Sequence, residues 1–132
     1  MAMAVRYGVI GCGMMGQEHL RNIALLPGAT VTSIFEPNDE MAAASLAMVP
    51  GARRAESISA VVTASDVDCL FIASPNFRHA EQLREIAALR DIPVLLESPP
   101  ARIWMMWRPW LHSPAITKRP FGSLWSVRLQ MV

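Results

Sequence analysis

The sequence of 132 residues has few cysteines and no long apolar run, and each shortage excludes a class of protein. Its two cysteines, Cys12 and Cys69, are too few for a disulfide framework and favour reduced thiols in a cytoplasmic protein. No run of about 18 apolar residues is present, so we expect no membrane-spanning helix. The N-terminus also lacks the charged segment and apolar core of a signal peptide, because a glycine-rich turn already begins at Gly11.

Negative charge is missing from the last part of the chain. All 11 acidic residues lie between Glu18 and Glu97, and with seven arginines they give residues 1–100 a formal charge of −4. Residues 101–132 contain five basic residues, no acid and all four tryptophans. The contrast predicts a globular domain over residues 1–100 and an atypical basic, tryptophan-rich tail over 101–132. Since the net charge of the whole chain is only +1, we expect no nucleic-acid partner.

The first 97 residues alternate between short apolar or β-branched runs and helical patterns. We expect five strands, over residues 5–10, 30–35, 53–55, 68–73 and 92–97. Helical patterns lie between them, and Asn76 is the expected N-cap of the helix that runs to about Arg90. Strands that alternate with helices imply right-handed crossovers. The sequence therefore predicts an α/β fold with a Rossmann-type, doubly wound parallel sheet, incomplete at about five strands.

A glycine-rich turn with the sequence Gly11-Cys12-Gly13-Met14-Met15-Gly16 links the first strand to the first helix. In this context Gly11 permits the tight turn, Gly13 lets the backbone approach a pyrophosphate, and Gly16 lets the helix pack closely on the strand. The helix N-terminus at Met14 and Met15 offers N–H groups and a partial positive charge to the phosphates. The turn therefore predicts a dinucleotide site that includes these two methionines.

Glu36 ends the second strand, 20 residues after Gly16. A carboxylate at this position binds the adenosine ribose hydroxyls. It would repel a 2′-phosphate, so NAD is expected as the cofactor in preference to NADP. The alternative is an ordinary surface glutamate beside a tight turn.

A second polar group, made of Ser74, Pro75, Asn76 and His79, follows the fourth expected strand. Ligands of open α/β sheets bind outside the carboxyl ends of the strands, so Asn76 is expected to face the nicotinamide half of the cofactor. His79 is a weak candidate for proton transfer. A packed structural histidine is the favoured interpretation of His79, and still more so of His19.

In their order, these residues resemble the N-terminal domain of the Gfo/Idh/MocA family, which includes glucose–fructose oxidoreductase and inositol dehydrogenase. The matching runs are Tyr7-Gly8-Val9-Ile10 with the glycine turn, His19, Glu36-Pro37, Ala73-Ser74-Pro75-Asn76 with His79, and Pro93-Val94-Leu95-Leu96-Glu97. The resemblance covers residues 5 to about 97 and implies that Glu97 also belongs to the cofactor site. It implies NAD(P)-dependent oxidation or reduction of sugars, inositols and related polyols.

Two departures from the family pattern concern catalysis. The family has Glu-Lys-Pro after the fifth strand, with a lysine that contributes to catalysis, whereas this chain has Glu97-Ser98-Pro99. A serine hydroxyl carries no charge and does not replace an ammonium group. The family's second, mostly β-sheet domain, which supplies substrate contacts, is also missing from the 132 residues. We therefore assign no catalytic residue and no metal site, and expect nucleotide binding without turnover, a sugar or polyol substrate only in a full-length parent, and no oligomer.

A single lost base accounts for both departures. The run Trp104-Met105-Met106-Trp107 has only one coding sequence, TGG ATG ATG TGG, which encodes Asp-Asp-Val when read from one base before the first ATG. Acidic residues are typical of a helix start. Loss of one A from GAG AAG CCC, which encodes Glu-Lys-Pro, leaves Glu-Ser-Pro and produces the frame seen here. The sequence thus predicts a tail that is disordered or derived from a shifted reading frame.

Two other functions stay open at this point. One is a non-enzymatic module that senses or sequesters a dinucleotide. The other is a fragment whose tail binds a membrane or a partner through Trp104, Trp107 and Trp110, which recur at helical spacing. Outside the tail nothing predicts membrane binding.

Overall fold

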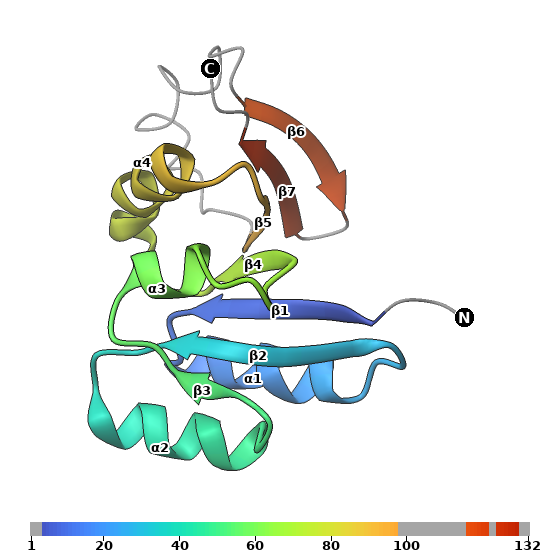
Figure 1. Cartoon of the computed structure of the whole chain (residues 1–132), viewed down its shortest axis with the longest axis vertical. Coiled ribbons are helices and arrows are strands. Elements are labelled where there is room, and N and C mark those ends of the chain that lie inside the picture. Colours follow the sequence, from blue (N-terminus) through green and yellow to red (C-terminus); the bar gives the residue numbers. More distant parts are fainter. Residues whose placement is uncertain (1–3, 98–115, 122–123, 130–132) are drawn as a thin grey trace.

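Residues 4–97, 116–121 and 124–129 are described by a computed structural model of the chain, in which one sheet carries helices on both faces (Figure 1). The sheet has seven strands in the order β3-β2-β1-β4-β5-β7-β6. The first five are parallel to one another: β1 (Val5–Ile10), β2 (Ala29–Phe35), β3 (Arg53–Arg54), β4 (Cys69–Ile72) and β5 (Pro93–Glu97). This arrangement confirms the predicted Rossmann-type parallel sheet. The chain proceeds outward from β1 in one direction to β3 and in the other from β4 to β5, so the topological switch point lies between β1 and β4.

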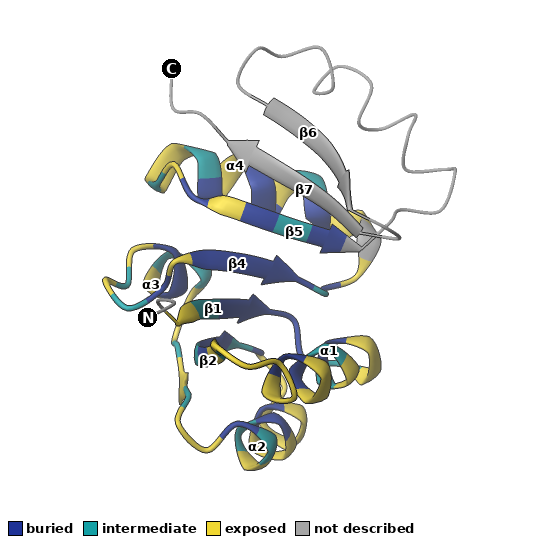
Figure 2. Ribbon diagram, turned by 90° about the vertical axis from the view of Figure 1, so that its right-hand side faces the viewer, coloured by how far each residue is buried: buried dark blue, intermediate teal, exposed yellow. Residues whose placement is uncertain are grey.

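Helices cover both faces of the parallel strands because successive side chains of each strand point to opposite sides. The helices are α1 (Met14–Ala24), α2 (Asp39–Met48), α3 (Ile58–Val62) and α4 (His79–Leu89). Val9 of β1 and Phe71 of β4 pack in one buried cluster with α1. Ile10 and Ile72, the next residues along these strands, pack in a second cluster with α3 and α4. Buried on both faces, β4 is enclosed along its whole length (Figure 2).

Two helix starts follow directly from side-chain capping. The Asn38 side-chain oxygen accepts a hydrogen bond from the Met41 N–H at 3.0 Å, and the Ser57 hydroxyl accepts one from the Ala60 N–H at 3.0 Å. Each side chain satisfies an N–H group that has no partner inside its helix. These caps fix where α2 and α3 begin. Within the described ranges no helix has the length and apolar character needed to cross a membrane.

The prediction that Asn76 caps the helix after β4 is wrong. Residues Asn76–Arg78 form a 3₁₀ turn, and α4 begins at His79 with Arg78 as its N-cap residue. The Arg78 N–H donates to the Pro75 carbonyl at 2.9 Å, which closes this tighter turn. Short 3₁₀ turns are frequent at helix N-termini, and here one takes the place of a side-chain cap.

Two strands that the sequence analysis does not predict extend the sheet past β5. β7 (Leu124–Leu129) pairs antiparallel with β5, with Ser126 opposite Leu95, and β6 (Ile116–Phe121) pairs antiparallel with β7. The strand edge of β5 that does not face β4 would leave backbone N–H and C=O groups unpaired, and β7 supplies partners for them. The division of the chain near residue 100 stays a prediction.

Ion pairs close the amino ends of the parallel strands. Asp68 accepts hydrogen bonds from the Arg6 backbone N–H at 2.8 Å and from its guanidinium at 2.9 and 3.0 Å. These bonds lower the pKa of the Asp68 carboxyl to about 2. Arg53 and Asp66 form a second pair nearby, at 2.6 Å. Charged groups at this end of the sheet are thus matched to one another.

Candidate cofactor site

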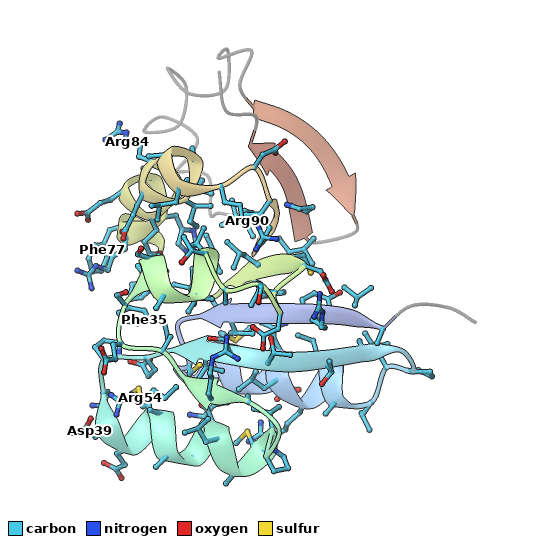
Figure 3. All side chains as sticks on the ribbon, viewed as in Figure 1. Phe35, Asp39, Arg54, Phe77, Arg84 and Arg90 are labelled. Atoms are coloured by element: carbon cyan, nitrogen blue, oxygen red, sulfur yellow. The ribbon has the colours of Figure 1, made fainter. Side chains whose placement is uncertain are left out.

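A cavity of about 550 Å³ lies at the carboxyl ends of β1, β2 and β4. Its wall consists of Ile10, Gly11, Gly13, Met14, Met15, Phe35, Glu36, Pro37, Met41, Ala73, Ser74, Pro75, Phe77, Arg78 and Gln82. Figure 3 shows Phe35 and Phe77 at this edge, to which the arrowheads of β1 and β2 also point in Figure 1. The cavity therefore occupies the position beside the switch point where open α/β sheets bind their ligands. It brings together the glycine turn, the end of β2 and the segment after β4.

The glycine turn is held against its neighbours so tightly that two of its residues have no room for a side chain. Gly11 has a φ of 91°, and a Cβ atom there would lie 2.6 Å from the Ser74 Cα. A Cβ atom at Gly16 would collide with the Gly11 carbonyl oxygen and lie 3.0 Å from the Gly11 carbonyl carbon. The backbone of the turn thus touches the segment after β4 on one side and α1 on the other.

Gly13 differs from these two glycines because it faces open space. A Cβ atom at this position would have no heavy atom within 4 Å. α1 begins at the next residue, Met14, and no side chain caps its N-terminus. The Gln17 side-chain amide donates to the Cys12 carbonyl at 3.1 Å and braces the turn from within the helix. This combination of free space, helix N–H groups and a rigid turn fits a pyrophosphate.

Glu36 is fixed between the glycine turn and the cavity. Its side chain is 8% exposed, and its two carboxylate oxygens accept hydrogen bonds from the Cys12 N–H at 3.1 Å and the Asn38 N–H at 3.0 Å. An ionised carboxylate has about four acceptor positions, so two remain after these bonds. The carboxylate is therefore oriented, and it still has acceptors for ribose hydroxyls.

Cys12 lies inside the turn as a buried thiol. Burial disfavours its thiolate and the nearby Glu36 carboxylate adds to this effect, so that the pKa of the thiol is raised to about 11. Burial likewise raises the pKa of Cys69 to about 11. Both cysteines are free and buried, as neutral thiols.

The segment after β4 is held by polar contacts within the fold. The Ser74 hydroxyl donates to the Gln82 side-chain oxygen, and the His79 Nε2 lies 2.7 Å from the Ser74 carbonyl oxygen. His79 is 1% exposed and does not line the cavity, which supports its interpretation as a structural histidine. His19 packs against Phe71 with ring centroids 4.3 Å apart, which supports the same interpretation for His19.

Three predicted site features lie outside the described part of the chain. They are Ser98 and the side chains of Asn76 and Glu97. Their assignments, like those of the other predicted cofactor-binding residues, stay predictions. Among the residues that the structure describes, no group of three or more His, Cys, Asp or Glu side chains is placed to hold a metal ion.

Several cavity residues were not predicted from the sequence. Phe35 carried a detectable signal, because it precedes Glu36 at the end of an alternating strand. Met41, Arg78 and Gln82 carried none, because their places depend on how α2 and α4 dock on the sheet. Arg54 was also missed, although it binds the backbone of Glu36.

Comparison with known proteins agrees with this geometry. The family model of Gfo/Idh/MocA oxidoreductases, which describes an NAD-binding Rossmann fold, matches residues 5–111. Inositol 2-dehydrogenase of Arthrobacter sp. (strain FB24) is 33% identical over 100 residues, which cover 75% of this chain and 29% of that enzyme. Inositol 2-dehydrogenase of Leifsonia xyli subsp. xyli is 38% identical over 96 residues, covering 72% of this chain and 28% of that enzyme. The chain thus spans less than a third of the length of these relatives.

Solved structures of two dehydrogenases are similar to the fold. The myo-inositol dehydrogenase of Lactobacillus casei, in complex with NAD(H) and myo-inositol, has a TM-score of 0.67 and 27% identity, covering 74% of this chain and 29% of that one. The WlbA dehydrogenase of Bordetella pertussis, in complex with NADH and UDP-GlcNAcA, has a TM-score of 0.71 and 28% identity, covering 84% and 32%.

Proposed function

Since the chain belongs to the Gfo/Idh/MocA family of oxidoreductases, we propose that it binds NAD(H) as the cofactor-binding part of a sugar or polyol dehydrogenase. The observation that carries this proposal is the open space at Gly13 on the wall of a cavity that also contains Glu36. Inositol dehydrogenases among the relatives make a cyclic polyol the first substrate to test for the full-length parent. The neutral buried cysteines favour a reducing compartment, the cytoplasm.

The proposed cofactor contacts divide between the two halves of the cavity. The N–H groups of Gly13, Met14 and Met15 would bind the pyrophosphate, and Glu36 would bind the adenosine ribose. On the nicotinamide side the proposed site continues with Ser74 and Pro75, which line the cavity, and with Asn76 and Glu97. His79, predicted together with them, would act from behind the cavity wall, by holding the Ser74 carbonyl. The chemistry that NAD supplies when bound is hydride transfer. The contribution of this chain's own residues is to bind the cofactor and orient it.

The test of this function is a titration of the purified 132-residue chain with NADH, followed by NADH fluorescence. We expect saturable binding. A folded sample without affinity for either NADH or NADPH would contradict the proposal. The same sample, supplied with NAD and myo-inositol, should show no growth of NADH absorbance.

A second candidate function is dinucleotide binding without any reaction. It is favoured by Ser98, which stands where the family carries a lysine. Turnover at the rate of an ordinary enzyme would eliminate this candidate. Binding without turnover supports it as a description of the chain, whatever the parent protein does.

The coding DNA distinguishes the two functions. We propose that residues 101–132 come from a reading frame shifted at codon 98. Sequencing across this codon should then show one additional base that restores lysine and continues the frame into a second domain. If the frame stands as read here, the product carries Ser98 where the family has a lysine, and dinucleotide binding without turnover is the better supported function.

Replacing Glu36 by alanine should weaken NADH binding about tenfold or more, because a hydrogen bond to a charged group contributes about 1.5–3 kcal/mol. The preference for NADH over NADPH should narrow at the same time, since the carboxylate that repels a 2′-phosphate is gone. Titration of the variant with both dinucleotides measures both effects. Glu56→Ala, at an exposed position away from the cavity wall, is the control and should bind as the unaltered chain does.

A further inference from the structure

Arg54 holds the backbone that follows β2. Its Nε and Nη2 donate hydrogen bonds to the Glu36 carbonyl at 3.2 and 2.9 Å, and Nη2 also donates to the Pro37 carbonyl at 3.3 Å. Arg54 reaches these carbonyls because β3 pairs with β2, with Arg54 beside Ile34. The guanidinium therefore fixes the main chain of the residue whose carboxylate faces the cavity.

The remaining side of the Arg54 guanidinium is paired with Asp39. Nη1 donates to the Asp39 carboxylate at 2.8 Å, and Figure 3 shows the two side chains together at the same end of the sheet as Phe35. The Asp39 side chain is 92% exposed and that of Arg54 is 35% exposed. An ion pair this exposed contributes little to folding stability. The pair can still affect a ligand that approaches Glu36. As long as Asp39 is bonded to it, the Arg54 guanidinium has less capacity to bind an anion.

We propose that Arg54 is a positioning residue for Glu36, and that the Asp39–Arg54 pair is a second determinant of the preference for NAD. This inference rests on the proposed function. In dinucleotide-binding domains an arginine near the ribose-binding carboxylate accommodates the 2′-phosphate of NADP. This chain places an arginine against the backbone of Glu36, and Asp39 accepts from Nη1, the one guanidinium nitrogen that is not bonded to Glu36 or Pro37.

Charge explains why the pair acts on NADP and not on NAD. Changing Asp39 to asparagine leaves an oxygen that accepts from Arg54 but removes the negative charge beside the guanidinium. A phosphate then competes for Nη1 with a neutral amide oxygen, and its charge-assisted hydrogen bond is the stronger of the two. NAD has only a hydroxyl at this position, so its affinity should change little.

The experiment compares single variants of neighbouring carboxylates in the full chain. NADH and NADPH are titrated separately into the unaltered chain, Asp39→Asn and Glu40→Gln. Glu40 is the matched control, because it is exposed and lies in the same first turn of α2. We expect Asp39→Asn to bind NADPH about tenfold more tightly, with NADH binding changed by less than about twofold. Glu40→Gln should leave the ratio of the two affinities as it is.

A double variant tests whether Arg54 carries the effect. Asp39→Asn combined with Arg54→Met should lose the gain in NADPH affinity, since the cation is gone. Arg54→Met alone should weaken NADH binding about tenfold, because the Glu36 backbone loses its donors. Should that variant fail to fold, Arg54→Lys keeps the charge without the planar fork and should likewise weaken NADH binding.

Three outcomes would overturn the inference. Asp39→Asn could leave the NADPH affinity unchanged, Glu40→Gln could raise it equally, or the double variant could keep the gain. In each case NADH binding by the unaltered chain would persist, so the proposed function would stand. Absence of NADH binding by the unaltered chain would reject both proposals together.

Discussion

Replacing Gly13 by valine should abolish measurable NADH binding and leave the fold intact. The space around Gly13 explains both halves of this expectation. A Cβ atom there would have no heavy atom within 4 Å, and the backbone φ of −71° is one that any residue adopts. A branched side chain therefore fits the protein, but it fills the position at which a pyrophosphate would approach the helix N–H groups.

The loss of affinity should be about 100-fold or more, because several charge-assisted hydrogen bonds are prevented at once. NADH fluorescence titration measures it, and thermal unfolding followed by circular dichroism checks the fold. Gly51→Val is the matched control, since Gly51 also faces open space but does not line the cavity. Unchanged NADH affinity in Gly13→Val would show that the cofactor binds elsewhere, and a collapse of its melting temperature would contradict the open space at Gly13.

The sequence predicted the parallel sheet well because its strands are recognisable one at a time. A strand buried on both faces reads as a continuous apolar run, as Cys69–Ile72 does. The glycine turn is equally recognisable, because its three glycines lie close together between a strand and a helix. The α/β class, the family and the NAD-binding fold could be predicted from these local patterns, and all three are confirmed.

Features that depend on distant parts of the chain were not predicted. Arg54 reaches the Glu36 backbone only through the pairing of β3 with β2, which no local pattern specifies. Asn76 has a good capping side chain, yet the hydrogen bond from the Arg78 N–H to Pro75 moves the start of α4 to His79. Local propensity identified the elements, whereas the long-range contacts determined the details of the cavity wall.

The largest loss of stability is expected for Gly11→Ala. Two costs add at this position: alanine is strained at a φ of 91°, and its Cβ atom would lie 2.6 Å from the Ser74 Cα and closer still to the Ser74 N. The colliding atoms belong to the backbone and cannot rotate aside. We expect the free energy of unfolding to fall by about 3–4 kcal/mol, a large part of the about 5–15 kcal/mol typical of a domain. Urea unfolding of the variant and the unaltered chain measures the difference.

Gly28→Ala separates the two costs. Gly28 also has a positive φ, of 75°, but a Cβ atom there would meet nothing within 4 Å. The free energy of unfolding of Gly28→Ala should therefore fall only by the cost of the strained left-handed backbone, about 1 kcal/mol. The difference between the two variants measures how firmly the glycine turn is pressed against the segment after β4. Equal losses would mean that this contact yields easily, and then the rigid turn on which the pyrophosphate site depends would not exist.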